Sequence, residues 1–288
     1  MSKVLVVSNC ATPGLVAGLR LLCPGLEVEG YEIAEARADP AKLRQDAARN
    51  DQLVLLPGVA ELLGSRLAAR KPSVTVPTFF FSGYHPDTVY LEDGAGQQIV
   101  SDYGAYHSLI GFAAWQAGLS EAETVRLYRG PVYQELGYFD EWDRQKTLLL
   151  SRFAEQGIDL TGPFLGWLRG GCFMYTINHP QARCLLDLAR LVARQLGAEP
   201  LAYDIVPRDM LVSGSVYPCY PEIAEACGTQ GSLLFKMSGK DRLLDLPQFL
   251  RQSFACYAAR AAAGLRPAPA FSAKLTRFEE RVLGRFGA

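Results

Sequence analysis

Histidine side chains are the first candidates for chemistry in this sequence. His85 stands in "GYHPD" and His179 in "NHP", so each precedes a proline, whereas His107 stands in "AYHS". Imidazole is the side chain best suited to proton transfer near neutral pH. Asp87 could orient an imidazole, or could simply close an Asx turn. His179 either takes part in catalysis or merely precedes a proline that starts a helix. His107, in a segment expected to be an apolar helix, is interpreted as a core residue.

A cysteine at the first predicted strand–helix junction is the second candidate. Cys10 follows the apolar run at residues 3–7, and Pro13 then suits the first turn of a helix. The positive end of the helix dipole favours a thiolate, so we expect a lowered pKa for Cys10, and backbone N–H groups there could stabilise an oxyanion. The alternative is a small buried apolar residue, the role assigned to the other cysteines. Asn9 could donate a hydrogen bond or tolerate an unusual turn conformation.

The first 90 residues alternate between strand-like and helix-like patterns. Short apolar runs predict strands at 3–7, 28–33 and 52–58 and at the start of 73–87, and helical spacing or capping residues predict helices at 13–23, 40–50 and 61–70. This alternation is typical of a parallel α/β sheet, which binds ligands at the carboxyl ends of its strands. We therefore expect the Cys10 junction and the His85 loop to meet at one wall of a cleft.

The middle of the chain is mainly helical by its sequence. Helical patterns cover 103–118, 120–139, 140–157 and 181–197, and Ser120 with Glu123 forms a capping-box signature. A strand is predicted at 232–237 and a helix at about 246–263, followed by a final charged helix. We predict a single α/β domain over 1–288, with a small parallel-sheet core at about 1–90, a large, mainly helical elaboration at about 100–210 and a mixed part at about 211–288.

Composition argues against several classes of protein. The 29 Lys and Arg balance 30 Asp and Glu, so bulk nucleic-acid binding is not expected. No apolar run approaches the roughly 20 residues of a membrane span, and the first residues lead into a strand without the pattern of a signal peptide. The seven cysteines show no zinc-ligand spacing, so no metal site is predicted, and reduced thiols in the cytoplasm are the simplest interpretation.

Familiar phosphate-binding and hydrolase signatures are missing. The first turn lacks G-x-G-x-x-G and the Walker lysine, and the sequence has no G-x-S-x-G elbow. Lys236 and Lys240, close together in "LLFKMSGKD", could bind phosphate or belong to a solvated basic face.

Six segments occur in an order that resembles the WcbI-type polysaccharide-biosynthesis proteins. They are "VLVVSNCATPGLVAGLRLL", "FFFSGYHPDTVYL", "YHSLIGFAAWQAGLS", "LGYFDEWDRQKTLLLSRFAEQGIDL", "FMYTINHPQARCLLDLARLV" and "VYPCYPEIAEACGTQGSLLFK". The resemblance runs from about residue 3 to about residue 240. It implies a small α/β core similar to that of SGNH/GDSL hydrolases, elaborated with helices. It also implies transfer of an acetyl group from acetyl-CoA to a sugar hydroxyl during capsular polysaccharide biosynthesis.

The resemblance also implies roles for particular residues. The family's "NC" falls on Asn9 and Cys10, whereas Ser8 and Ala11 replace the glycine and glutamine of its usual "GNCQ". The "YHPD" and "NHP" motifs fall on residues 84–87 and 178–180.

A mechanism follows from these positions. We expect His85, oriented by Asp87, to take the proton of the sugar hydroxyl, with His179 as the alternative base. The Cys10 turn would stabilise the oxyanion, or Cys10 would carry the acyl group covalently.

Coenzyme A needs contacts to its phosphates, and the candidates come from two parts of the chain. The first-turn residues Ser8 and Asn9 are expected to contact the coenzyme, and Lys236, Lys240 and Arg169 to supply cations. Two other functions stay open at this point: an SGNH-like esterase that transfers the acyl group to water, and a non-catalytic CoA-binding module in glycan assembly.

Overall fold

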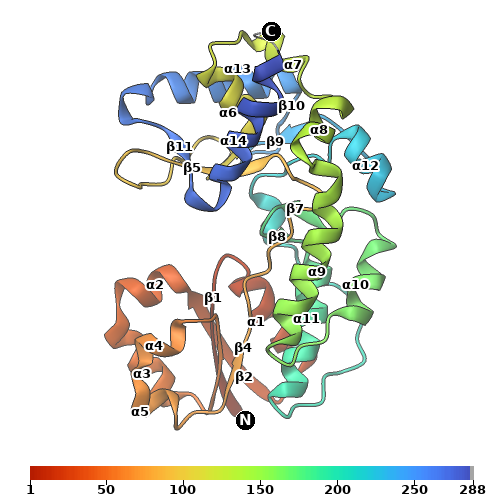
Figure 1. Ribbon diagram of the computed structural model, residues 1–288. Helices are drawn as coiled ribbons and strands as arrows, with labels where there is room; N and C mark the ends of the chain where they lie inside the picture. Colours follow the sequence, from red (N-terminus) through yellow and green to blue (C-terminus); the bar gives the residue numbers. More distant parts are fainter. Residues whose placement is uncertain (286–288) are drawn as a thin grey trace. The chain divides into compact units, whose positions relative to one another are not determined.

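The computed structural model describes residues 1–285 and places them in two compact units (Figure 1). Unit 1 consists of Met1–Phe80, Thr147–Met174 and Asn178–Val212, and unit 2 of Phe81–Lys146, Tyr175–Ile177 and the chain from Ser213 onward. Each unit is therefore built from separate stretches of sequence. Residues 286–288 of the predicted domain lie outside the described residues, and its being one domain stays a prediction.

A four-stranded parallel sheet forms the centre of unit 1, with the strand order β2-β1-β3-β4. Val4 to Val7 in β1 are each 0% exposed, which explains their unbroken apolar run, since a central parallel strand is covered on both faces. The order places β2 on one side of β1 and β3 on the other, which is the switch point where doubly wound sheets bind ligands. The strands are β1 (Ser2–Ser8), β2 (Leu26–Glu32), β3 (Gln52–Leu55) and β4 (Ser73–Thr75).

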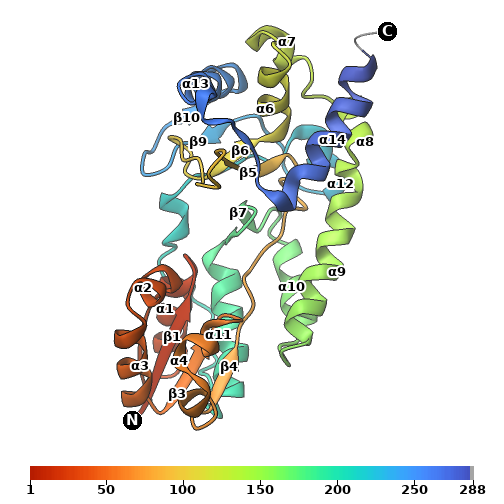
Figure 2. The same cartoon turned by 60° about the vertical axis from the view of Figure 1, so that its left-hand side comes forward.

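Helices cover both faces of this sheet (Figure 2). Leu5 and Leu53 of the strands share one buried cluster with Leu43 and Val59 of the helices on the first face. On the other face lies α1 (Thr12–Leu22), where a Cβ added to Gly30 of β2 would meet the Val16 side chain at 2.9 Å. The helices of the first face are α2 (Ile33–Ala38), α3 (Pro40–Arg49) and α4 (Val59–Leu63), and α5 (Ser65–Ala68) follows them.

Helix α1 packs closely against α11 (Ala182–Gln195). A Cβ added to Gly14 would collide with the Leu185 side chain, and one added to Gly18 would lie 2.8 Å from the Ala189 Cβ. The two glycines therefore let the helices approach. Because both contacts shift by four residues in the same direction, α1 and α11 run parallel and begin at the same end of the pair.

The remaining part of unit 1 adds an aromatic cluster beside α11. Trp167 packs against Phe79 and Phe173 with ring centroids 5.6 and 5.5 Å apart. The elements are the second half of α9 (Glu141–Ala154), α10 (Thr161–Leu168), the start of β7 (Met174–Thr176), β8 (His179–Pro180) and the start of η2 (Leu211–Ser213).

Unit 2 combines a small antiparallel sheet, of order β11-β5-β6, with helices. Its core is rich in aromatic side chains, among them Phe235 and Phe249, whose stacked rings lie 3.9 Å apart. The strands are β5 (Thr88–Glu92), β6 (Tyr106–Ser108), β9 (Phe235–Lys236), β10 (Leu243–Leu244) and β11 (Arg266–Pro267). The α-helices are α6 (Leu109–Gln116), α7 (Glu121–Val125), α8 (Gly130–Leu136), α12 (Pro221–Cys227), α13 (Leu246–Ala258) and α14 (Ser272–Arg281), and 3-10 turns lie at η1 (Tyr138–Asp140), η3 (Ala261–Ala263), η4 (Pro269–Phe271) and η5 (Leu283–Arg285).

The predicted fold class is confirmed as a mixed α/β protein with a parallel sheet and many helices, but two segments differ. The predicted helix at 103–118 is wrong at its start, because His107 lies in β6 and Ser108 then caps α6 through the Gly111 N–H. The predicted helix at 120–139 is divided into α7 and α8. Within residues 1–285, none of the helices has the length and apolar character needed to cross a bilayer.

Candidate functional site

The turn between β1 and α1 is fixed by Asn9. Its side-chain Oδ1 accepts a hydrogen bond from the Ala11 N–H at 3.0 Å, and its backbone oxygen accepts from the N–H and hydroxyl of Thr12 at 2.9 and 2.8 Å. Ser8, which ends the strand, is buried. The amide oxygen of Asn9 is thus used within the turn, and its NH₂ group is the part that can donate to a ligand.

Cys10 lies half-buried in this turn, and its electrostatic surroundings correct the sequence-based expectation. Burial and the Glu32 carboxylate raise the pKa of Cys10 to about 11, against the opposing effect of the Cys10 and Ala11 N–H groups. The expected lowering is wrong because the thiol is largely removed from water and, second, because Glu32 ends β2 in register with Ser8. The thiol is therefore protonated at neutral pH.

His179 lies in β8, just before α11. Burial lowers the pKa of His179 to about 4, while Asp209 acts in the opposite direction. Asp209 also accepts hydrogen bonds from the N–H groups of Ala182 at 2.7 Å and Leu211 at 3.0 Å, and so caps α11. The imidazole is neutral near pH 7 and can accept a proton. The helix begins after Pro180, so this proline is not in its first turn.

The parallel pairing of α1 and α11 relates the Cys10 turn to the His179 segment. Gly14 faces Leu185 near the start of both helices, which begin at Thr12 and Ala182. The Cys10 turn and the His179 segment therefore lie at the same end of this helix pair, next to the carboxyl end of β1. Sequence reasoning did not identify this pairing, although the Gly14-x-x-x-Gly18 spacing is a signal for close helix contact.

Unit 2 holds the other predicted acid–base pair, His85 and Asp87, and both side chains are buried. The His85 Nδ1 lies 3.3 Å from the Pro218 oxygen. Asp87 is the centre of a hydrogen-bond network: its carboxylate accepts from the Ile110 N–H and the Tyr138 hydroxyl, both at 2.9 Å, and from the Tyr220 hydroxyl at 2.7 Å. These bonds give Asp87 a clear structural role, and its orientation of His85 stays a prediction.

The three predicted phosphate-binding cations have different surroundings. The Lys236 Nζ donates to the backbone oxygens of Gly214 at 3.0 Å and Ser213 and Met237 at 3.3 Å, which closes a loop of unit 2. The Lys240 Nζ lies 3.9 Å from the Asp102 carboxylate, and both side chains are exposed. Arg169 is exposed at the end of α10, in the same unit as Cys10.

The parallel sheet, with helices on both faces and a polar turn after its central strand, defines a doubly wound α/β protein, a class whose ligands commonly bind at this edge of the sheet. A profile of the family described as polysaccharide biosynthesis enzyme WcbI matches residues 3–201, and the chain belongs to this family.

A solved structure described as WcbI, a novel polysaccharide biosynthesis enzyme, gives the same fold. It aligns with 99% of this chain and 96% of its own, with a TM-score of 0.63 and 17% sequence identity. Its description specifies the native protein without a disulfide bond between coenzyme A and a cysteine of that protein. A comparison with curated proteins finds no match.

Proposed function

We propose that this protein is a CoA-dependent acyltransferase that acetylates a sugar hydroxyl in the biosynthesis of a capsular or related polysaccharide. The observation that carries the proposal is the placement of the Cys10 turn and the His179 segment at one end of the α1–α11 pair, beside the carboxyl end of β1. The description of the WcbI structure, which mentions coenzyme A and a cysteine, supports a place for the coenzyme beside Cys10.

The residues of unit 1 suit direct acyl transfer. The oxygen of the acceptor hydroxyl would attack the carbonyl carbon of bound acetyl-CoA and form the new ester bond, and the carbon–sulfur bond to coenzyme A would break. His179, neutral at pH 7, accepts the proton of the acceptor hydroxyl and returns it to the departing sulfur. The N–H of Cys10 and the NH₂ group of Asn9 would donate to the oxygen that gains charge, whereas the Ala11 N–H already donates to the Asn9 Oδ1 within the turn. The raised pKa of Cys10 argues against its carrying the acyl group covalently.

We rank His179 before His85 as the base because His179 belongs to the same unit as Cys10. His85, oriented by Asp87, is kept as the second candidate. Among the cations, Arg169 is the leading candidate for a coenzyme phosphate because it is exposed in unit 1, whereas Lys236 already holds three backbone oxygens. Ser8 and Lys240 remain proposed contacts.

Two measurements test the proposal. Coenzyme A should raise the melting temperature, because a ligand that binds only the native state stabilises it. Release of free thiol from acetyl-CoA, with methyl glycosides of glucose, galactose and mannose as acceptors, should fall about 10²-fold or more in His179→Gln and stay near wild type in His85→Gln. The reverse pattern would move the base to His85, and unchanged rates in both variants would contradict the assignment.

The alternatives give different results in the same experiments. Hydrolysis of p-nitrophenyl acetate without any thermal shift by coenzyme A would favour the SGNH-like esterase. A thermal shift without acyl transfer to any glycoside would favour a non-catalytic CoA-binding module. The strand order β2-β1-β3-β4 is consistent with the proposed SGNH/GDSL-like core, and the single-domain organisation and the cytoplasmic location are kept as parts of the proposal.

A further inference from the structure

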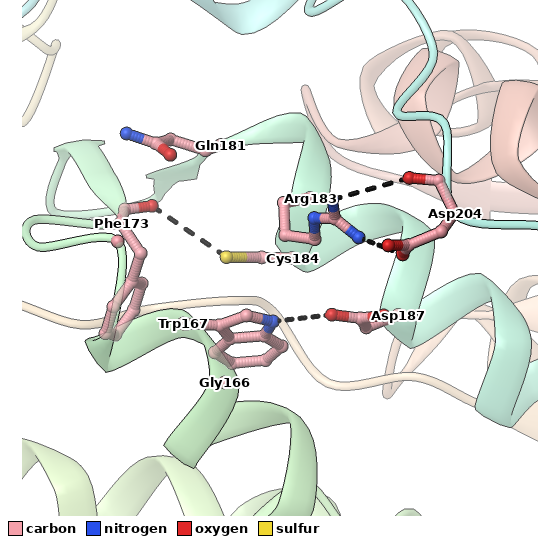
Figure 3. A pocket seen from close by; sticks show the side chains of 9 residues that line it. Gly166, Trp167, Phe173, Gln181, Arg183, Cys184, Asp187 and Asp204 are labelled. Atoms are coloured by element: carbon pink, nitrogen blue, oxygen red, sulfur yellow. Dashed lines mark hydrogen bonds and ion pairs between the residues drawn. The ribbon is translucent and has the colours of Figure 1, made fainter.

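A pocket of about 420 Å³ opens beside the first turns of α11, within unit 1 (Figure 3). Its apolar wall is made by Trp167 and Phe173, and its polar wall by Gln181, Arg183, Asp187 and Asp204. None of these residues belongs to the motifs that the sequence singled out for chemistry. Gln181 directly precedes α11, so this edge of the pocket lies at the same end of the α1–α11 pair as the Cys10 turn.

Asp187 is the less exposed of the two acidic side chains of the pocket, at 16% against 85% for Asp204. One carboxylate oxygen of Asp187 accepts from the Trp167 Nε1 at 2.8 Å, and the other from the Arg190 Nη1 at 2.6 Å. Trp167 is itself only 4% exposed, so it forms a fixed floor. A carboxylate has about four acceptor positions, so Asp187 is held in place and can still accept hydrogen bonds from hydroxyl groups.

The rim of the pocket carries the ion pair between Arg183 and Asp204, with side chains 40% and 85% exposed. Figure 3 shows this pair and the Trp167–Asp187 pair beside one another along α11. Arg183 uses Nη1 and Nη2 toward Asp204, and a guanidinium has five N–H donors. The rim can therefore both donate to a ligand and accept from one.

The charge of the walls selects among ligands. Each carboxylate of the pocket faces a guanidinium group, since Asp187 pairs with Arg190 and Asp204 with Arg183. These charges balance, so an anionic group such as a phosphate or a uronic acid would find no unpaired cation and would lose its hydration. A neutral ring with several hydroxyl groups can donate to the carboxylates and accept from Arg183 and Gln181.

We propose that this pocket binds a neutral sugar ring of the acceptor glycan, with Arg183 and Asp187 as the residues that set its specificity. The inference rests on the proposed function, since it makes the pocket the acceptor side of the same site. Gly166 is a second position at which a substitution can test the pocket, because it lines the pocket and a Cβ added there meets nothing within 4 Å.

The test is saturation-transfer NMR with the methyl glycosides of glucose, galactose and mannose, with glucuronic acid as the anionic probe and coenzyme A as the separate ligand. Arg183→Ala removes the exposed donor, and Gly166→Leu adds a bulky side chain at the pocket. The matched controls are Arg194→Ala, an exposed cation in the last turn of α11, and Gly162→Leu, whose added Cβ also meets nothing within 4 Å but which does not line the pocket.

We expect wild type and both controls to bind at least one neutral glycoside more tightly than glucuronic acid. Arg183→Ala should lower the affinity for that glycoside about tenfold, as expected for one lost hydrogen bond to a charged group. Gly166→Leu should also lower this affinity. Unaltered glycoside binding in both pocket variants, preference for glucuronic acid, or no glycoside signal at all would overturn the proposal.

A loss of coenzyme A binding in Arg183→Ala, with glycoside binding retained, would also overturn it and assign the pocket to the coenzyme. Glycoside binding can be measured whether or not the protein binds coenzyme A or transfers an acyl group from acetyl-CoA. Failure of the acyltransferase proposal is therefore distinguishable from failure of the pocket assignment.

Discussion

Replacing Gly18 by alanine tests the contact that places the candidate site. The added Cβ would lie 2.8 Å from the Ala189 Cβ, whereas unbonded carbons are comfortable at about 3.5–4.0 Å. Overpacking of this kind costs about 1–3 kcal/mol, and alanine recovers up to about 1 kcal/mol through its better helix propensity. We expect a net loss of about 1–2 kcal/mol in the free energy of unfolding.

Urea unfolding measures this loss as a lower transition midpoint with an unchanged slope. The matched control is Gly166→Ala, in the interior of α10, where an added Cβ meets nothing within 4 Å. That substitution should stabilise the protein by about 0.5–1 kcal/mol, because only the helix propensity changes.

A second substitution shows whether the loss comes from the α1–α11 contact. Ala189→Gly removes the methyl group that the new side chain of Gly18→Ala would meet. The double variant should therefore be more stable than the sum of the two single effects predicts, with a coupling of about 1 kcal/mol or more. If Gly18→Ala is as stable as wild type, or if the two effects simply add, the parallel pairing of α1 and α11 is refuted, and with it the placement of Cys10 near His179.

Three further outcomes follow from the structure. Alkylation of Cys10 by iodoacetamide, measured by peptide mass spectrometry, should keep accelerating up to about pH 11, and a plateau near pH 8 would contradict its raised pKa. Burial lowers the pKa of His107 from 6.5 to about 4, so the unfolded chain takes up a proton before the folded chain does as the pH falls below 6.5. Between pH 7 and pH 5, the free energy of unfolding of wild type should therefore decrease by about 2 kcal/mol more than that of His107→Gln. Urea unfolding at the two pH values measures this difference, and equal decreases would refute it. Tyr220→Phe removes a 2.7 Å bond to the buried carboxylate of Asp87 and should lower the free energy of unfolding by about 2 kcal/mol, whereas a neutral effect would show that this bond is dispensable.

Local signals in the sequence predicted the elements around the first turn. The apolar run of β1 and Pro13 placed the β1–α1 junction correctly. The helix predicted at 40–50 is confirmed as α3, which the Asp39 side chain caps, and the predicted Ser120–Glu123 capping box is confirmed at the start of α7. These features depend on neighbouring residues, so a sequence pattern is enough to find them.

Features that depend on distant residues were not predictable in this way. The pKa of Cys10 is decided by burial and by Glu32, which reaches the turn only because β2 aligns with β1. His107 was expected in a helix because β6 has three residues and leads directly into α6, so the helical pattern dominates its surroundings. The WcbI resemblance did identify the family correctly, and the roles of His85, His179 and the lysines stay predictions.

The order of the segments has a consequence for synthesis on the ribosome. The sheet of unit 1 is complete by Phe80, but α11, which covers α1, starts at Ala182. At about 5–20 residues per second, this second helix emerges roughly 5–20 s after the sheet. During that interval the glycine face of α1 is open to water, so nascent chains halted between these two points are the species in which we expect chaperone binding and aggregation.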